Sequence, residues 1–219
     1  MKLATIALLG ILLLGSFASM QAADPAGAGQ MVLAFTGGSA YTSDTGGICI
    51  WYPLLVGDLN MEFLFEFDGR VPATDKEHAY LIWVSEFEAL PQTSYSLAPS
   101  SNGLFTLQLV PTGSATIYFS DRPQLRKWKD LTDRSTWGQP VATFTRQAGI
   151  FQSTDGGMSG GMTNSAVLLS SKPFKLNGVT FDFKDLIPHG MTCFETGFSG
   201  NDEWGDDEAG TCIAIGPAK

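Results

Sequence analysis

LNMEFLFEFD, residues 59–68, is the stretch that decides the fold class predicted for this chain. Its odd positions form one apolar face, made of Met61, Phe63, Phe65 and Phe67. The even positions are mostly polar or acidic. A helix would spread those four side chains around its circumference, whereas a strand places alternate residues on one face. The stretch therefore predicts a half-buried β-strand.

The same alternation recurs along the chain, between glycine-rich turns. Residues 79–84 (AYLIWV) are apolar on both faces and predict a central strand that is covered on both sides. Asn177-Gly178 predicts a tight hairpin within residues 174–183, because both turn positions need a positive φ. Further short strands are predicted at 31–35, 48–56, 105–109, 115–119, 141–145, 166–169 and 211–215. This pattern predicts a single all-β domain over 23–219, an antiparallel β-sandwich with a closed β-barrel as the alternative.

One segment differs from the strand pattern. Residues 122–131 predict a short helix, because Asp121 can cap it and Pro123 stands in its first turn. The basic residues of this region are Arg122, Arg126, Lys127, Lys129 and Arg134. The first three of them predict a site for an anionic ligand, such as a carboxylate, a phosphate or an acidic polysaccharide. The alternative is a solvated helix face balanced by neighbouring aspartates.

The N-terminus predicts a secretory signal peptide over residues 1–22. Lys2 precedes an apolar run at 3–14, and small residues follow it. A membrane-spanning helix needs about 20 apolar residues, and Gly15-Ser16 interrupts this run before that length is reached. Cleavage after Ala18 is the alternative to cleavage after Ala22. We therefore expect a secreted or periplasmic protein with no membrane span after cleavage.

The charge of the chain excludes one class of partner. It holds 13 basic and 22 acidic residues, for a formal net charge of −9. Phosphate backbones bind to a positive surface field. We therefore expect no nucleic-acid partner for this acidic protein.

The chain has three cysteines, Cys49, Cys193 and Cys212, and their number and positions predict which of them form a disulfide. In an exported protein an odd count predicts one disulfide and one remaining thiol, or pairing with another chain. Cys193 and Cys212 bracket a short segment and are the predicted pair. Cys49 lies in a strand-like run and is predicted to be a buried apolar thiol. A structural, envelope-associated protein joined to another chain through Cys49 is the alternative.

An acidic segment, NDEWGDDE at 201–208, lies between the two predicted disulfide partners. Carboxylate oxygens are ligands that calcium prefers. The candidate calcium ligands are Asp202, Glu203, Asp206 and Asp207. The spacing does not match an EF-hand, so a solvated acidic loop is the alternative. We expect no other cofactor.

The tryptophans divide by their surroundings. Trp51 and Trp83 stand in apolar runs and are predicted to be core residues. Trp137 and Trp204 stand in polar segments and are candidates for an exposed platform that stacks on sugar rings. A carbohydrate ligand is therefore a second prediction, beside the anionic one.

Catalytic motifs give little support to an enzyme. The chain has two histidines, His78 and His189, and it lacks a Gly-x-Ser-x-Gly elbow and a His-Glu-x-x-His helix. An extracytoplasmic hydrolase would rely on His189 or on paired carboxylates of the predicted strands. Those carboxylates are Glu62, Glu66, Glu86 and Glu88.

The stretch ATIYFSDRP, residues 115–123, resembles a motif of exported microbial proteins of unknown function. In that family a strand ending in this motif is followed by a short polar helix and a tryptophan. An Asn-Pro-Pro-Asn turn of that family is absent here. The resemblance implies an exported protein and brings no activity with it. The residues themselves favour a non-enzymatic binding module for an anionic or carbohydrate ligand, with the hydrolase and the structural protein as alternatives.

Overall fold

The computed structural model describes residues 26–43, 46–60, 80–88, 95–96, 105–109, 113–121, 133–154, 159–176, 179–199 and 206–216. Three predicted elements lie outside these residues: the signal peptide at 1–22, most of the strand at 59–68, and the helix at 122–131. Only Leu59–Asn60 of that strand is described, as the short strand β3.

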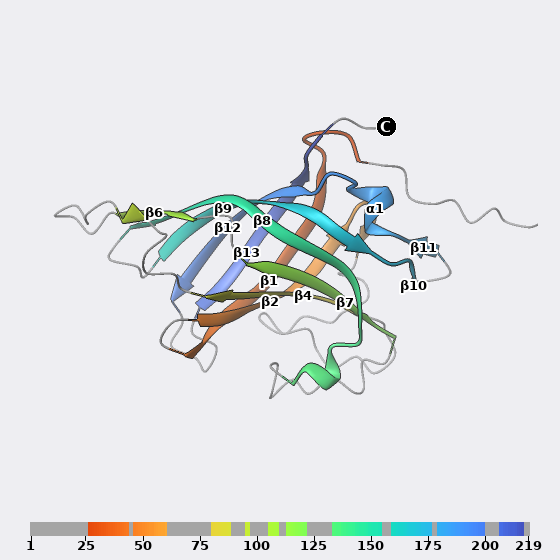
Figure 1. The fold of residues 1–219 in the computed structure, drawn as a ribbon, viewed down its shortest axis with the longest axis horizontal. Helices are drawn as coiled ribbons and strands as arrows, with labels where there is room; N and C mark the ends of the chain where they lie inside the picture. Colours follow the sequence, from red (N-terminus) through yellow and green to blue (C-terminus); the bar gives the residue numbers. More distant parts are fainter. Residues whose placement is uncertain are drawn as a thin grey trace, which may run out of the picture.

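Eight antiparallel strands close into a barrel (Figure 1). In order around the barrel they are β1 (Met31–Ser43), β2 (Gly46–Val56), β4 (Tyr80–Glu88), β7 (Ser114–Ser120), β8 (Gln139–Thr154), β9 (Ser159–Ser171), β12 (Met191–Ser199) and β13 (Asp206–Ala214). Each strand pairs with the next along the chain, and β13 pairs with β1. The barrel is thus an up-and-down meander in which the last strand meets the first.

Smaller elements surround the barrel. The strands β5 (Tyr95–Ser96) and β6 (Phe105–Leu109) continue the sheet from the outer half of β8. A separate two-stranded sheet consists of β10 (Phe174–Leu176) and β11 (Val179–Phe181). The helix α1 (Phe183–Leu186) follows it, and one turn of 3-10 helix, η3, spans Arg134–Thr136.

The all-β prediction is confirmed, and the closed barrel, its stated alternative, is the architecture that forms in place of the sandwich. The strand β8 makes the difference between a closed barrel and a sandwich. Its residues 139–145 pair with β7, and its residues 142–154 pair with β9. A sandwich would leave the edges of two sheets unpaired, whereas this long strand joins both halves of the meander and leaves the barrel without an edge.

Several strand predictions are confirmed in detail. Residues 81–85 of β4 are all buried, as expected for a strand covered on both faces. The predicted hairpin forms through the pairing of Phe174 with Phe181 and of Leu176 with Val179. Every other predicted short strand overlaps an observed one.

An apolar layer closes one end of the barrel, which we call the α1 end. Asp182 caps α1 by accepting a hydrogen bond from the backbone N–H of Lys184. Phe183 is buried, with Phe144 of β8 edge-on at 6.3 Å between ring centroids. Leu186 lies against Gly57, which follows β2 on another side of the barrel. We call the opposite end, where β12 ends and β13 begins, the loop end.

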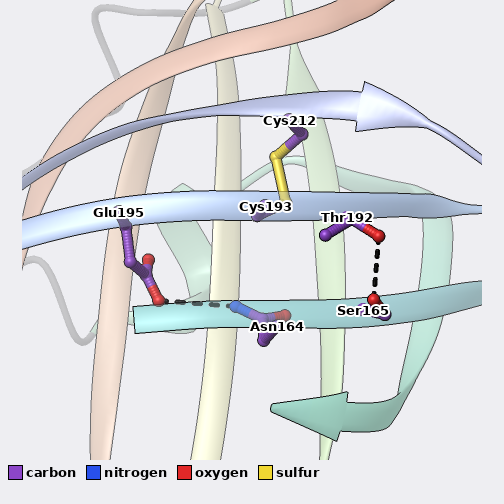
Figure 2. Close-up of a disulfide and its surroundings, with 6 residues drawn as sticks. All are labelled: Asn164, Ser165, Thr192, Cys193, Glu195 and Cys212. Carbon is purple, nitrogen blue, oxygen red and sulfur yellow. Dashed lines mark hydrogen bonds between the residues drawn. A yellow bond between two sulfur atoms is a disulfide. The ribbon is translucent and has the colours of Figure 1, made fainter. Parts of the chain in front are cut away.

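The disulfide prediction is confirmed. Cys193 and Cys212 are directly opposite each other on β12 and β13, and they form a disulfide with 4.0 Å between their Cα atoms (Figure 2). Cys49 lies on β2 and is buried, at 7 % exposed, as predicted. A buried thiol cannot reach another chain, so the structural protein joined through Cys49 is not supported.

Replacing both disulfide cysteines should weaken the barrel without abolishing it. The bond closes a loop with a sequence separation of 19. Loop-closure entropy alone predicts a loss of about 3 kcal/mol in the free energy of unfolding for Cys193→Ala/Cys212→Ala. Urea unfolding measures this loss, and circular dichroism should still show β-sheet. The variant Cys49→Ala is the control, because it leaves the bond intact. A double variant that unfolds with the same urea midpoint as the wild type would contradict the prediction.

Candidate ligand-binding site

Three aromatic side chains meet inside the barrel on neighbouring strands. They are Phe35 of β1, Trp51 of β2 and Trp83 of β4, each at most 3 % exposed. Trp51 is directly opposite Trp83, with 4.7 Å between their ring centroids. Phe35 lies 5.5 Å from Trp51 and 5.3 Å from Trp83. The prediction that both tryptophans are core residues is confirmed.

A carboxylate reaches this aromatic cluster from β13. The indole Nε1 of Trp51 donates a hydrogen bond to Oε2 of Glu208, at 2.6 Å. The strand β1 runs between them, and its Gly37 is directly opposite both residues. Because Gly37 has no side chain, the indole and the carboxylate can approach each other across β1.

A second carboxylate lies deeper inside, on β12. Glu195 is 7 % exposed, and Nδ2 of Asn164 donates to its Oε1 at 3.4 Å (Figure 2). Gly210 of β13 is directly opposite both Glu195 and Phe35. A Cβ atom at Gly210 would lie 2.6 Å from Cζ of Phe35 and 2.9 Å from Cβ of Glu195. The absent side chain thus lets the Phe35 ring pack beside Glu195 and remove it from water.

The burial of Glu195 changes its ionisation. Removal from water raises the pKa of Glu195 to about 8, and the negative charge of Glu208 adds to this rise. The positive charge of Arg146 and the hydrogen bond from Asn164 lower the pKa by less. At neutral pH Glu195 is therefore mostly protonated and carries an O–H group, which can donate a hydrogen bond.

The indole of Trp83 supplies another donor. Its Nε1 is buried and meets no acceptor among the residues that the structure describes. A buried donor without an acceptor costs about 1–3 kcal/mol of stability. It stands in the same aromatic cluster as Trp51, whose own N–H is satisfied by Glu208. The interior thus offers an unused N–H at a place where an acceptor would stabilise the protein.

One of the predicted site residues is buried instead of exposed. Trp137 is 1 % exposed, and its ring packs on Tyr118 of β7 at 5.1 Å between centroids. The guanidinium of Arg134 lies 5.6 Å from the same ring. The prediction of an exposed platform at Trp137 is therefore wrong, because these neighbours cover a residue that the polar sequence around it suggested was exposed.

The other predicted site residues are described only in part. Outside the described residues lie Arg122, Arg126, Lys127, Asp202, Glu203 and Trp204. Asp206 and Asp207 form the start of β13, so the acidic segment is not a loop over its whole length. No group of three or more His, Cys, Asp or Glu residues placed to hold a metal is found in the described part of the chain. Calcium binding stays a prediction.

Of the residues suggested for a hydrolase, only His189 has a side chain that the structure describes. His189 is exposed in the turn before β12, at the α1 end, whereas Glu195 lies farther along β12. Glu62, Glu66 and His78 are outside the described residues, and of Glu86 and Glu88 only the backbone, in β4, is described. Among the described carboxylates, the barrel brings Glu195 and Glu208 close enough for their charges to interact, and neither is among the candidate site residues predicted from the sequence.

Comparisons with protein-family models, with curated proteins and with solved structures find no match to this chain. Among the described residues, no helix is long and apolar enough to cross a membrane.

The raised pKa of Glu195 predicts a pH-dependent stability. An unfolded glutamate has a pKa near 4.5, whereas folded Glu195 has one of about 8. Between these values the folded state holds a proton that the unfolded state lacks, so the free energy of unfolding falls as the pH rises from 5 to 8 and levels off above it. The fall amounts to a few kcal/mol. Glu195→Gln should lack it.

Urea unfolding at a series of pH values tests this prediction. The control is Asp58→Asn, which removes a carboxyl group from the exposed turn after β2. If the free energy of unfolding changes with pH in the same way in the wild type and in Glu195→Gln, Glu195 does not titrate as inferred.

Proposed function

We propose that this protein is an exported, non-enzymatic binding module that holds a small, neutral, hydroxyl-rich ligand such as a carbohydrate inside its barrel. The observation that carries the proposal is the buried indole N–H of Trp83, which finds no acceptor among the described residues. Buried donors in native proteins are rarely left unpaired. An eight-stranded barrel is wide enough to hold one small ligand. The signal at residues 1–22 supports a secreted or periplasmic location.

The chemistry of the site favours a neutral sugar over an anion. A hydroxyl group both donates and accepts, so it can accept from Trp83 while it donates to the carboxylate of Glu208. Aromatic rings beside a few convergent polar groups are typical of small-molecule sites. An anion would instead meet the negative charge of Glu208. The anionic ligand predicted from Arg122, Arg126 and Lys127 would need another site.

Entry from the loop end fits the rest of the barrel. At the α1 end the side chains of Phe183 and Leu186 are buried in the core. Glu208 is the third residue of β13, which begins at the loop end, and it is only partly buried. A ligand that enters there reaches Glu208 first and the deeper Glu195 afterwards.

A thermal-shift screen of the mature protein tests the binding proposal. The ligands are neutral oligosaccharides, acidic polysaccharides and calcium. A neutral sugar at a concentration well above its Kd should raise the Tm by about 5 °C or more. Trp83→Phe should lose most of this shift, because it keeps an aromatic ring and removes the N–H.

The matched control for that screen is Trp137→Phe. Trp137 is also a buried tryptophan, but it packs on Tyr118 and not in the Phe35, Trp51 and Trp83 cluster. This variant should have a lower Tm without ligand and an undiminished shift with it. The absence of a shift with every neutral sugar, or a full shift in Trp83→Phe, would overturn the proposal.

A second candidate function, a glycoside hydrolase, is favoured by the Glu195 and Glu208 pair. Such enzymes need one protonated carboxyl and one carboxylate near the scissile bond. Burial raises the pKa of Glu195 to about 8, which suits a general acid. Glu195 would protonate the leaving glycosidic oxygen while Glu208 takes a proton from the water that attacks the sugar carbon. The products are two sugars, and no other reactant is needed.

Turnover separates this second candidate from simple binding. If the site is hydrolytic, a sugar that stabilises the wild type is cleaved on long incubation, and Glu195→Gln binds it without cleaving it. Chromatography of the sugar after incubation measures both species. Recovery of intact sugar from the wild type, together with a thermal shift, would reject the hydrolase and retain the binding module.

A further inference from the structure

Exposed hydrophobic side chains gather on one part of the outer surface. Five large hydrophobic side chains among the described residues are exposed: Met31, Ile150, Leu169, Phe194 and Phe198. All but Met31 lie on the neighbouring strands β8, β9 and β12. The most exposed are Phe198, at 63 %, and Leu169, at 61 %. Clusters of exposed apolar side chains mark interaction sites more often than scattered ones do.

The strand register places Ile150, Phe194 and Phe198 on a common outer face, and Leu169 is exposed on β9, the middle strand of the three. Phe194 is directly opposite Thr163, which in turn is directly opposite Ile150. Directly opposite residues of an antiparallel pair point to the same side of the sheet. Glu195 and Cys193 flank Phe194 and are buried, so Phe194 and Phe198 point outward. We call the outward residues of 148–152, 159–169 and 192–198 the β8–β9–β12 face.

No residue of the β8–β9–β12 face carries a charge. Its members are Ala148, Ile150, Gln152, Ser159, Gly161, Thr163, Ser165, Val167, Leu169, Thr192, Phe194, Thr196 and Phe198. The hydroxyls of Ser165 and Thr192 bond to each other at 2.8 Å (Figure 2), so covering them leaves no new unpaired group. An uncharged face of this length stands out in a chain of net charge −9.

We propose that the β8–β9–β12 face is the interface of a homodimer, packed against the same face of a second copy. Two copies of net charge −9 repel each other, and contact through this face buries no charge of its own members, while Asp207 of β13, directly opposite Phe198, lies at its edge. In a closed symmetric dimer a twofold axis passes through the interface. The exposed apolar side chains of this face in one copy would then pack against the same face of the other copy. The face therefore fits a partner surface that is uncharged and apolar. The same face of a second copy is such a surface.

The size of the face fits a reversible dimer. The face holds five residues of β8, eleven of β9 and seven of β12, and at about 3.3 Å along and 4.8 Å across the sheet for each residue this gives roughly 360 Å² for each copy. The two copies together bury about 720 Å², which is less than a stable interface needs and is in the range of weak, transient contacts. We therefore expect a dimer that dissociates on dilution. The proposal does not depend on the interior ligand site, because the two sets of residues point to opposite sides of the sheet.

Analytical ultracentrifugation of the mature protein over a wide concentration range tests the dimer. The wild type should change from monomer to dimer as its concentration rises, and added salt should tighten the dimer because it screens the repulsion between the copies. Phe194→Ser/Phe198→Ser should raise the dimer Kd on the order of a hundredfold, since each change removes an aromatic contact. Both side chains are exposed, so circular dichroism should show a folded barrel.

Met31→Ser is the matched control, because Met31 is 45 % exposed, like Phe194, but lies on β1 outside the face. It should leave the Kd unchanged. A wild type that stays monomeric at every concentration, or a double variant that dimerises as tightly as the wild type, would overturn the proposal. A monomeric wild type that binds neutral phosphatidylcholine vesicles through the two phenylalanines would assign the face to a lipid surface and would also overturn it.

Discussion

The space inside a closed eight-stranded barrel limits which side chains can meet there, and two glycines set that limit in this protein. Gly37 stands directly opposite Trp51 and Glu208, and Gly210 stands directly opposite Phe35 and Glu195. In each case the middle strand contributes no side chain, so residues of its two neighbours come together across it. The hydrogen bond from Trp51 to Glu208 and the burial of Glu195 beside Phe35 both depend on this arrangement.

The disulfide fixes the second feature on which the site depends, the direction in which β12 faces. Cys193 bonds to Cys212 inside the barrel, so Glu195, two residues farther along, also points inward. Phe194 and Phe198 must then point outward, and they are exposed. The usual distribution, with phenylalanine inside and glutamate outside, is reversed in this strand. The interior carboxylate and the apolar outer face are thus two results of one strand orientation.

These relations explain how much the sequence could predict. Alternation located most strands, and cysteine spacing located the disulfide, because both signals are local. Barrel closure depends on the pairing of β8 with β9 as well as with β7, and alternation is the same in a sandwich. Glu208 was assigned to an acidic loop because its partner Trp51 is 157 residues away. Glu195 has a usable signal in the sequence, because a disulfide residue at position 193 that points inward places position 195 on the same face of the strand.

The interior site lowers the stability of the fold in two ways that apolar residues would avoid. Trp83 keeps an N–H without an acceptor among the described residues, and the burial of Glu195 disfavours its ionisation. The disulfide and the apolar layer at the α1 end offset these costs elsewhere in the barrel. Features that weaken a fold locally are concentrated at functional sites. Because Glu195 is mostly neutral at pH 7, its O–H can donate a hydrogen bond to an uncharged polar ligand, whereas the charge of Glu208 repels an anion, which is the physical reason for preferring a neutral sugar.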